Sequence, residues 1–394
     1  MQERWLVYAS FLIIFAFTTV DASISPMVLP LQAHFGVPME QVLRLISSCT
    51  AGIVLGVFWG PMLTRAFKLP LLIVWTVTLM VLGTVGFLLS DSFELAMLCR
   101  LVFGGAAGVM ASVMWWITFH GVSKANYQAM VNVLMSARPL AAALGVPLAT
   151  IVASRTNWNT PFALFTLLIL ACGLLLYAMS RPLHQHVEKW ETKGMLRDYR
   201  SALSQPMAIP FYTGVVFNKA CYFGLYAIAG IWFYRHYGLH LVEVGTRLFF
   251  IGLSEVVMTF AAPHILKQLG YVRTFVGSLL LSGVVFLLLI KGYFPLNMTT
   301  TLFVIFVGLD RVSSMAITLA LPKLFPLTDN RAVFGSLITL AAWFGLTLVS
   351  YFEGSNIDRL GLGNVEWILL ASFIMGSYMI YHVQRTRVFH LMEV

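Results

Sequence analysis

Residues 70–90 read PLLIVWTVTLMVLGTVGFLLS, and this stretch contains no charged side chain. A helix needs about 20 apolar residues to cross the ~30 Å hydrocarbon layer of a bilayer, so this stretch alone is long enough to span it. Together with similar apolar runs along the chain it predicts twelve membrane-spanning helices, the others near 5–29, 42–63, 95–119, 128–153, 160–180, 207–233, 244–267, 272–291, 298–321, 332–352 and 364–384.

The composition agrees with a membrane protein. Of the 394 residues, 59% are hydrophobic and only 10% are charged, whereas a soluble domain carries about 25% charged residues. Outer-membrane barrels alternate apolar and polar residues in strands of roughly 10 residues, and the long continuous runs here do not. The sequence therefore predicts an all-α membrane protein with twelve transmembrane helices in two six-helix bundles.

The formal net charge of +9 could indicate a nucleic-acid partner. In a polytopic membrane protein, however, Lys and Arg collect in cytoplasmic loops, and an N-terminus inside places about fifteen of them on that side against about six outside. We therefore expect both termini to be cytoplasmic, in a bacterial cytoplasmic (inner) membrane, and no nucleic-acid partner. The four cysteines lie in predicted spans without metal-ligand spacing, so neither a metal nor a cofactor is expected.

One long polar stretch, residues 181–206, divides six predicted spans from six. It predicts an N-terminal six-helix bundle over 1–180, a cytoplasmic linker over 181–206 and a C-terminal six-helix bundle over 207–394. The mixed charge of the linker suits either an amphipathic helix on the membrane surface or a plain connection.

A weak repeat relates the two halves. Gly60-Pro61-Met62-Leu63-Thr64-Arg65 ends the second span, and Ala262-Pro263-His264-Ile265-Leu266-Lys267 ends the eighth. In transporters built from two such halves, the substrate site lies between them near the midplane and is reached from either side by alternating access. The repeat therefore predicts transport.

Three short motifs resemble the major facilitator superfamily and, within it, the twelve-span drug:proton antiporter branch. Asp21 is followed by Leu29-Pro30, Arg100 and Gly104 form an Arg-x-x-x-Gly motif, and Gly145-Val146-Pro147 is similar to the Gly-Pro motif associated with exporters. The loop after Gly60-Pro61 keeps the basic Arg65 but has Thr64 and Phe67 where the family has Asp and Gly. The resemblance thus implies an antiporter fold in which Gly60, Pro61, Arg65, Gly104, Gly145 and Pro147 serve conformational change.

Ionisable residues inside the predicted spans are the candidate site. A charge at membrane depth costs about 2.5–3.5 kcal/mol on insertion scales, so such residues tend to face a protein interior or a hydrated path. An acid that alternates between dry and wet surroundings can carry a proton, and a cation nearby tunes its affinity. Asp21 is the expected proton carrier or an anchor for a cationic substrate, and Arg100 is its expected neighbour. The alternatives for Asp21 are a structural ion pair or a cap for the break at Ser25-Pro26, and the alternative for Arg100 is snorkelling to the headgroups. The other candidates within the spans are Arg138, Lys219, Glu255, Asp310 and Arg311.

The candidate substrate-binding residues combine charges with aromatic rings. Lys219, Tyr222 and Tyr226 lie close together along one predicted helix, where they could hold an anionic or sugar-like group. The alternative is that the two phenols only pack the helix interface. Glu255 is a possible partner for Lys219. Neighbours on a helix point about 100° apart, so we expect one of Asp310 and Arg311 to face a cavity and the other to pair with another helix. A structural salt bridge is the alternative for this pair. The bases Arg138, Lys219 and Arg311 favour a polar, anionic or zwitterionic solute over a cationic drug.

These features leave several functions open. The first is proton-coupled export of a small polar or amphiphilic organic solute; the second is proton-coupled uptake of an anionic or chelating nutrient. Translocation of lipid or lysolipid would use the same charges. A membrane enzyme or receptor is not expected, because the sequence has no Ser-x-x-Lys, His-Glu-x-x-His, Gly-x-Ser-x-Gly or Gly-Lys-Ser motif and no sizeable soluble segment for signalling. The expected partners are the solute, protons and membrane lipid, with the protein acting as a monomer.

Overall fold

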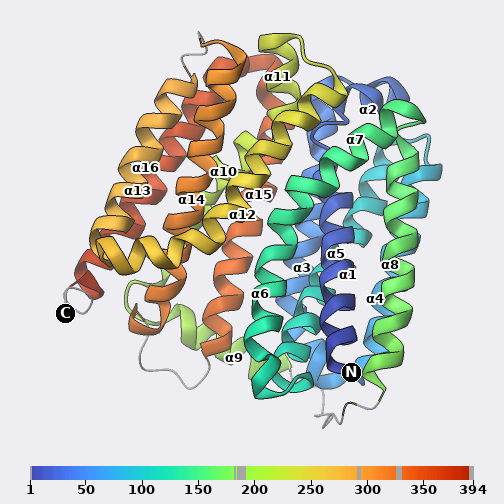
Figure 1. The fold of residues 1–394 in the computed structure, drawn as a ribbon, viewed down its shortest axis with the longest axis vertical. Coiled ribbons are helices and arrows are strands. Elements are labelled where there is room, and N and C mark those ends of the chain that lie inside the picture. Colours follow the sequence, from blue (N-terminus) through green and yellow to red (C-terminus); the bar gives the residue numbers. More distant parts are fainter. Residues whose placement is uncertain (1, 182, 184–191, 291–293, 325–330, 390–394) are drawn as a thin grey trace. The chain divides into compact units, whose positions relative to one another are not determined.

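The computed structural model describes residues 2–181, 183, 192–290, 294–324 and 331–389. Within these residues every regular element is helical (Figure 1). Eleven helices are long and apolar enough to cross a membrane, and a twelfth span is complete if one bent pair of helices is counted as a single crossing. The predicted all-α membrane fold is confirmed.

The chain divides into two compact units. Unit 1 comprises Met1–Thr192 with His240–Phe249. Within it α3 packs along α5, α4 lies against both α5 and α8, and α1 packs against α6 and α8. The elements of unit 1 are α1 (Gln2–Ala22), α2 (Val28–Phe35), the 3₁₀-helix η1 (Met39–Leu43), α3 (Arg44–Ala66), α4 (Leu69–Leu89), α5 (Phe93–Trp116), the π-helix η2 (Ile117–Gly121), α6 (Lys124–Leu140), the π-helix η3 (Ala141–Gly145), α7 (Val146–Arg155) and α8 (Asn159–Ser180).

Unit 2 comprises Lys193–Leu239 with Phe250–Val394. Within it α10 packs against α15 and α16, and α13 packs against α14 and α16. Its elements are α9 (Thr192–Leu203), α10 (Ala208–Ala227), α11 (Ala229–Tyr237), α12 (Leu241–Leu269) from Phe250 onward, α13 (Tyr271–Ile290), α14 (Leu296–Leu324), α15 (Arg331–Leu360) and α16 (Leu362–Arg387).

Part of the predicted linker is helical. The α9 helix occupies residues 192–203 of the 181–206 stretch, whereas residues 182 and 184–191 lie outside the described part. Tyr199 and Ala202 are buried, and Arg197 and Arg200 are exposed. This two-faced helix favours the amphipathic alternative over a plain connection; its place at a membrane surface stays a prediction.

Two predicted spans are broken. The first, expected over 5–29, ends as a helix at Ala22, and a turn precedes α2. Pro26 lies in that turn, where its missing N–H cannot continue an α-helical ladder. The seventh, expected over 207–233, bends by 52° between α10 and α11. Hydrophobicity alone does not reveal the break in the seventh span, because that segment stays apolar through it, whereas Ser25 and Pro26 mark the break in the first.

The fifth span changes its helical pitch where the Gly-Pro motif lies. The π-helix η3 separates α6 from α7, and Pro147 falls in the first turn of α7. A π-turn is a common device at a proline, since it reroutes the hydrogen bonds that the ring interrupts. A Cβ on Gly145 would overlap the Thr19 side chain of α1, so this glycine permits close contact between the two helices.

Glycines also let α3 and α5 touch backbone to backbone. A Cβ on Gly104 would overlap the carbonyl group of Cys49, and a Cβ on Gly56 would overlap that of Gly105. Small residues at helix contacts are the usual way in which membrane helices approach closely. Because Arg100 lies one turn before Gly104, this contact fixes where its guanidinium group enters unit 1.

Candidate functional site

Unit 1 contains a buried ion pair between α1 and α5. The Arg100 Nη2 atom donates to Asp21 Oδ1 at 2.9 Å, and Nη1 donates to the Val20 carbonyl oxygen at 3.5 Å. The two side chains are 2% and 11% exposed. The guanidinium carbon also lies 5.4 Å from the Phe103 ring centre, a cation–π distance. The structure thus joins the two residues, while their role in proton coupling stays a prediction.

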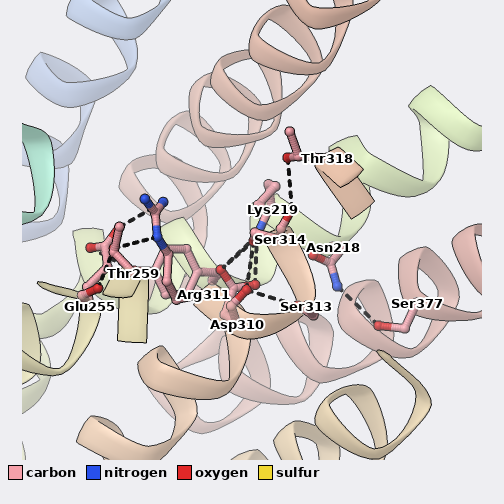
Figure 2. Close-up of polar contacts among 11 residues, drawn as sticks. Asn218, Lys219, Glu255, Thr259, Asp310, Arg311, Ser313, Ser314, Thr318 and Ser377 are labelled. Atoms are coloured by element: carbon pink, nitrogen blue, oxygen red, sulfur yellow. Dashed lines mark hydrogen bonds and ion pairs between the residues drawn. The ribbon is translucent and has the colours of Figure 1, made fainter. Parts of the chain in front are cut away.

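Unit 2 contains a second buried pair, between α10 and α14. Figure 2 shows the Lys219 Nζ atom between both carboxylate oxygens of Asp310, each at 2.7 Å, and the Ser314 hydroxyl at 2.6 Å. The Lys219 ammonium also lies 5.3 Å from the Tyr222 ring centre. All three hydrogens of the ammonium group therefore have an acceptor in reach, so this is a well-satisfied buried charge.

A looser pair lies beside it, between α12 and α14. Arg311 Nη1 is 3.8 Å from Glu255 Oε1, and Arg311 Nε donates to Thr259 Oγ1 at 2.9 Å (Figure 2). The Tyr222 hydroxyl donates to Glu255 Oε2 at 3.3 Å. Tyr222 thereby contacts both pairs, through its ring on one side and its hydroxyl on the other.

The pairing corrects one expectation and agrees with another. Glu255 was expected to pair with Lys219, but Lys219 binds Asp310 and Glu255 faces Arg311. For Asp310 and Arg311 the structure agrees with the salt-bridge alternative, because each residue pairs with a different helix; that either faces a substrate cavity stays a prediction. Their roughly 100° separation on α14 explains this, because it points Asp310 toward α10 and Arg311 toward α12.

The other predicted site residues are placed as follows. Arg138 lies half-buried near the end of α6 in unit 1, and Tyr226 lies one turn beyond Tyr222 on α10 in unit 2. That either contributes to substrate binding stays a prediction. Among the conformational residues, Pro61 lies inside α3, Arg65 is exposed in its last turn, and Gly60 contacts the Ser112 side chain.

Sequence reasoning missed two buried acids of unit 2. Glu353 is 0% exposed and Glu366 is 3% exposed; the latter accepts a hydrogen bond from Trp232 Nε1 at 2.6 Å. The predicted span 332–352 ended one residue before Glu353, because the following Gly-Ser-Asn reads as a loop. Helix α15 continues to Leu360 instead. The sequence does contain a sign that the helix continues: apolar residues at helical spacing lie on either side of Glu353, namely Leu346, Val349 and Ile357. All three are buried in the structure.

The fold and these paired intramembrane charges define a polytopic helical membrane protein with a polar interior. A sequence model of the Major Facilitator Superfamily matches residues 9–350. The chain therefore belongs to the Major Facilitator Superfamily.

Individual relatives are distant. The chain is 23% identical over 227 residues to a protein of Escherichia coli (strain K12) named "Putative transporter AraJ", covering 58% of this chain and 53% of that protein, so the match spans about half the length of this relative. Two crystal structures share the fold. One is the peptide transporter POT in complex with alafosfalin, with TM-score 0.79, 13% identity and coverage of 98% of this chain and 96% of that chain. The other is a D-xylose–proton symporter, with TM-score 0.74, 14% identity and coverage of 97% and 98%.

Proposed function

We propose that this protein is a secondary active transporter that exports a small polar or amphiphilic organic solute in exchange for protons, by alternating access. One observation carries the proposal: membrane-spanning helices of both units hold buried ion pairs, Asp21 with Arg100 and Lys219 with Asp310. Buried charges in such helices are costly and mark solute or proton paths. Membership of a transporter family supports transport over enzymatic activity.

The chemistry of the unit 2 pairs suggests the solute. Lys219 and Arg311 are balanced by Asp310 and Glu255, so the cluster offers both signs of charge. The Arg311–Glu255 pair is the more open one, with side chains 20% and 16% exposed against 11% and 7% for Lys219 and Asp310. A solute carboxylate or phosphate would displace Glu255 from Arg311, where a planar guanidinium group binds such anions in bidentate geometry. A zwitterion would in addition use the released Glu255.

Proton coupling follows from the unit 1 pair. A proton on Asp21 cancels its charge and leaves the buried Arg100 guanidinium without its counter-ion. An uncompensated buried charge is strongly unfavourable, so protonation is matched by a rearrangement of α1 against α5. A proton that shifts a conformational equilibrium in this way is coupled to any solute that binds one conformation better than the other.

Several further features are proposed on the sequence alone. We assign residues 1–180 and 207–394 to the two bundles and 181–206 to a cytoplasmic linker. Both termini are assigned to the cytoplasm of a bacterial cell, with the protein in the inner membrane. It acts as a monomer in contact with membrane lipid.

Inverted membrane vesicles with an acidic interior test the proposal. The solute is first identified by thermal shift of purified protein against sugars, nucleosides, organic acids, amino acids, metallophores and cationic dyes. An exporter accumulates that solute inside such vesicles, and we expect Asp21→Asn to abolish accumulation because its charge no longer responds to protons. The matched control is Asp91→Asn, an exposed aspartate that should leave accumulation unchanged.

Two results would count against the proposal. Accumulation only in right-side-out vesicles with an acidic exterior would instead favour the uptake of an anionic or chelating nutrient. Accumulation in Asp21→Asn equal to that of the unchanged protein would remove Asp21 from proton coupling, whatever the direction of transport.

A further inference from the structure

Glu353 occupies an unusual place in unit 2. It lies on α15 and is completely buried, and neither carboxylate oxygen has a hydrogen-bond partner among the residues that the structure describes. The carboxyl group lies against Gly224 of α10, where an added Cβ would be 2.8 Å from Glu353 Oε1. The missing side chain at Gly224 therefore makes the space that the carboxyl group fills.

The charged groups near Glu353 form an ion pair with each other and not with Glu353. Cys221, one turn before Gly224 on α10, has Lys219, Asp310 and Glu353 as its charged neighbours, which places the carboxyl group near the Lys219–Asp310 pair. Lys219 donates to Asp310 of α14 and to Ser314, and not to Glu353. No cation in the described part of unit 2 therefore balances Glu353.

The other ionisable groups facing this region do not supply a counter-ion. On α16, Glu366 lies one turn before Leu369, which contacts the same Gly224, and it is an acid held by Trp232. On α10, Tyr222 and Tyr226 are neutral phenols. On α15 itself, Asp358 lies beyond Glu353 with its side chain 60% exposed and pairs with Arg235 at 3.8 Å.

A carboxylate buried without a counter-ion or donor costs several kcal/mol, whereas a neutral acid avoids most of that cost. We propose that Glu353 is a second proton-binding site, separate from Asp21, which takes one proton from water and returns one proton to water in each transport cycle. In the arrangement described by the structure the O–H bond is formed. The proton leaves when a rearrangement brings water or the Lys219 ammonium to the carboxyl group.

Infrared spectroscopy of the purified protein tests the site without any transport. The carbonyl stretch of a protonated carboxylic acid should be present near neutral pH, shrink as the pH is raised and the acid ionises, and be missing in Glu353→Gln. Glu94→Gln, at an exposed glutamate, is the matched control and should keep the band. Glu366→Gln separates the contribution of the other buried acid.

A second readout rests on the proposed function. If two protons move per solute, Glu353→Gln removes one of them, and the accumulation ratio should fall about tenfold per unit of pH gradient. Asp21→Asn should instead abolish accumulation. A pH-sensitive band in a protein that accumulates no solute would keep the site and reject the transport proposal.

Opposite results would overturn the site. A band that is absent, that persists unchanged in Glu353→Gln, or that keeps its full amplitude at every pH would show that Glu353 does not exchange a proton. If Glu353→Gln does not fold, Gly224→Ala serves instead, since its methyl group crowds Oε1 and should shift the frequency of the Glu353 band. No shift in that variant would equally reject the assignment.

Discussion

Replacing Gly104 by alanine should be the most destabilising single methyl addition in unit 1. The new methyl group would overlap the Cys49 carbonyl group, so α5 can accept it only by moving away from α3. Overpacking commonly costs about 1–3 kcal/mol, and a clash with backbone rather than with a flexible side chain belongs at or above the upper end. The measurement is the midpoint of thermal unfolding of the purified protein in detergent.

The neighbouring glycine provides the control. A Cβ on Gly105 would meet only the Gly52 carbonyl oxygen, at 3.8 Å, an ordinary contact distance. Gly105→Ala should therefore change the free energy of unfolding by less than about 1 kcal/mol, the usual scale of a Gly-to-Ala change in a helix. Equal destabilisation by the two variants would contradict the backbone contact between α3 and α5.

The second large effect is expected at the Lys219–Asp310 pair. Asp310→Asn leaves a buried ammonium group with only the Ser314 hydroxyl and an amide oxygen as acceptors. Breaking a buried pair in this way costs about 3–5 kcal/mol, so both stability and transport should fall. Thermal unfolding and vesicle accumulation are measured on the same preparations.

A double variant separates the two losses. Lys219→Met with Asp310→Asn removes both charges and should recover most of the stability, because a neutral pair leaves no charge uncompensated. Transport should remain absent if the charges bind solute. Asp358→Asn, in the exposed pair with Arg235, should cost at most about 1 kcal/mol. Recovery of transport in the double variant would make the pair purely structural.

The fold was predictable because long apolar runs recur along the whole chain. An uncharged run such as 70–90 has almost no alternative to a spanning helix, and α4 occupies Leu69–Leu89. The predicted spans are wrong where hydropathy carries no information about the direction of the helix axis. The bend near Ile228 leaves the chain equally apolar, so only backbone hydrogen bonding distinguishes a straight span from a broken one there. The turn after α1 is different, because Ser25 and Pro26 mark it in the sequence.

The site was predictable in membership but not in pairing. Any charge in an apolar run is conspicuous, which is why Asp21, Arg100, Lys219 and Asp310 could be named. Partners depend on the rotation of each helix about its axis, and a sequence without coordinates leaves that rotation free. Glu353 was missed for a different reason. The polar residues that follow it resemble a loop, although Val349, Glu353 and Ile357, four residues apart, all face inward.

The adjacency of Asp310 and Arg311 limits how α14 can move. One of these residues is joined to α10 and the next to α12, so any twist of this segment displaces both ion pairs together. Rotation of the helix therefore cannot break one of the two ion pairs and leave the other intact. Either the helix slides along its axis, or both ion pairs open together. Inserting one residue between them would rotate everything on one side by about 100° and uncouple the partners permanently.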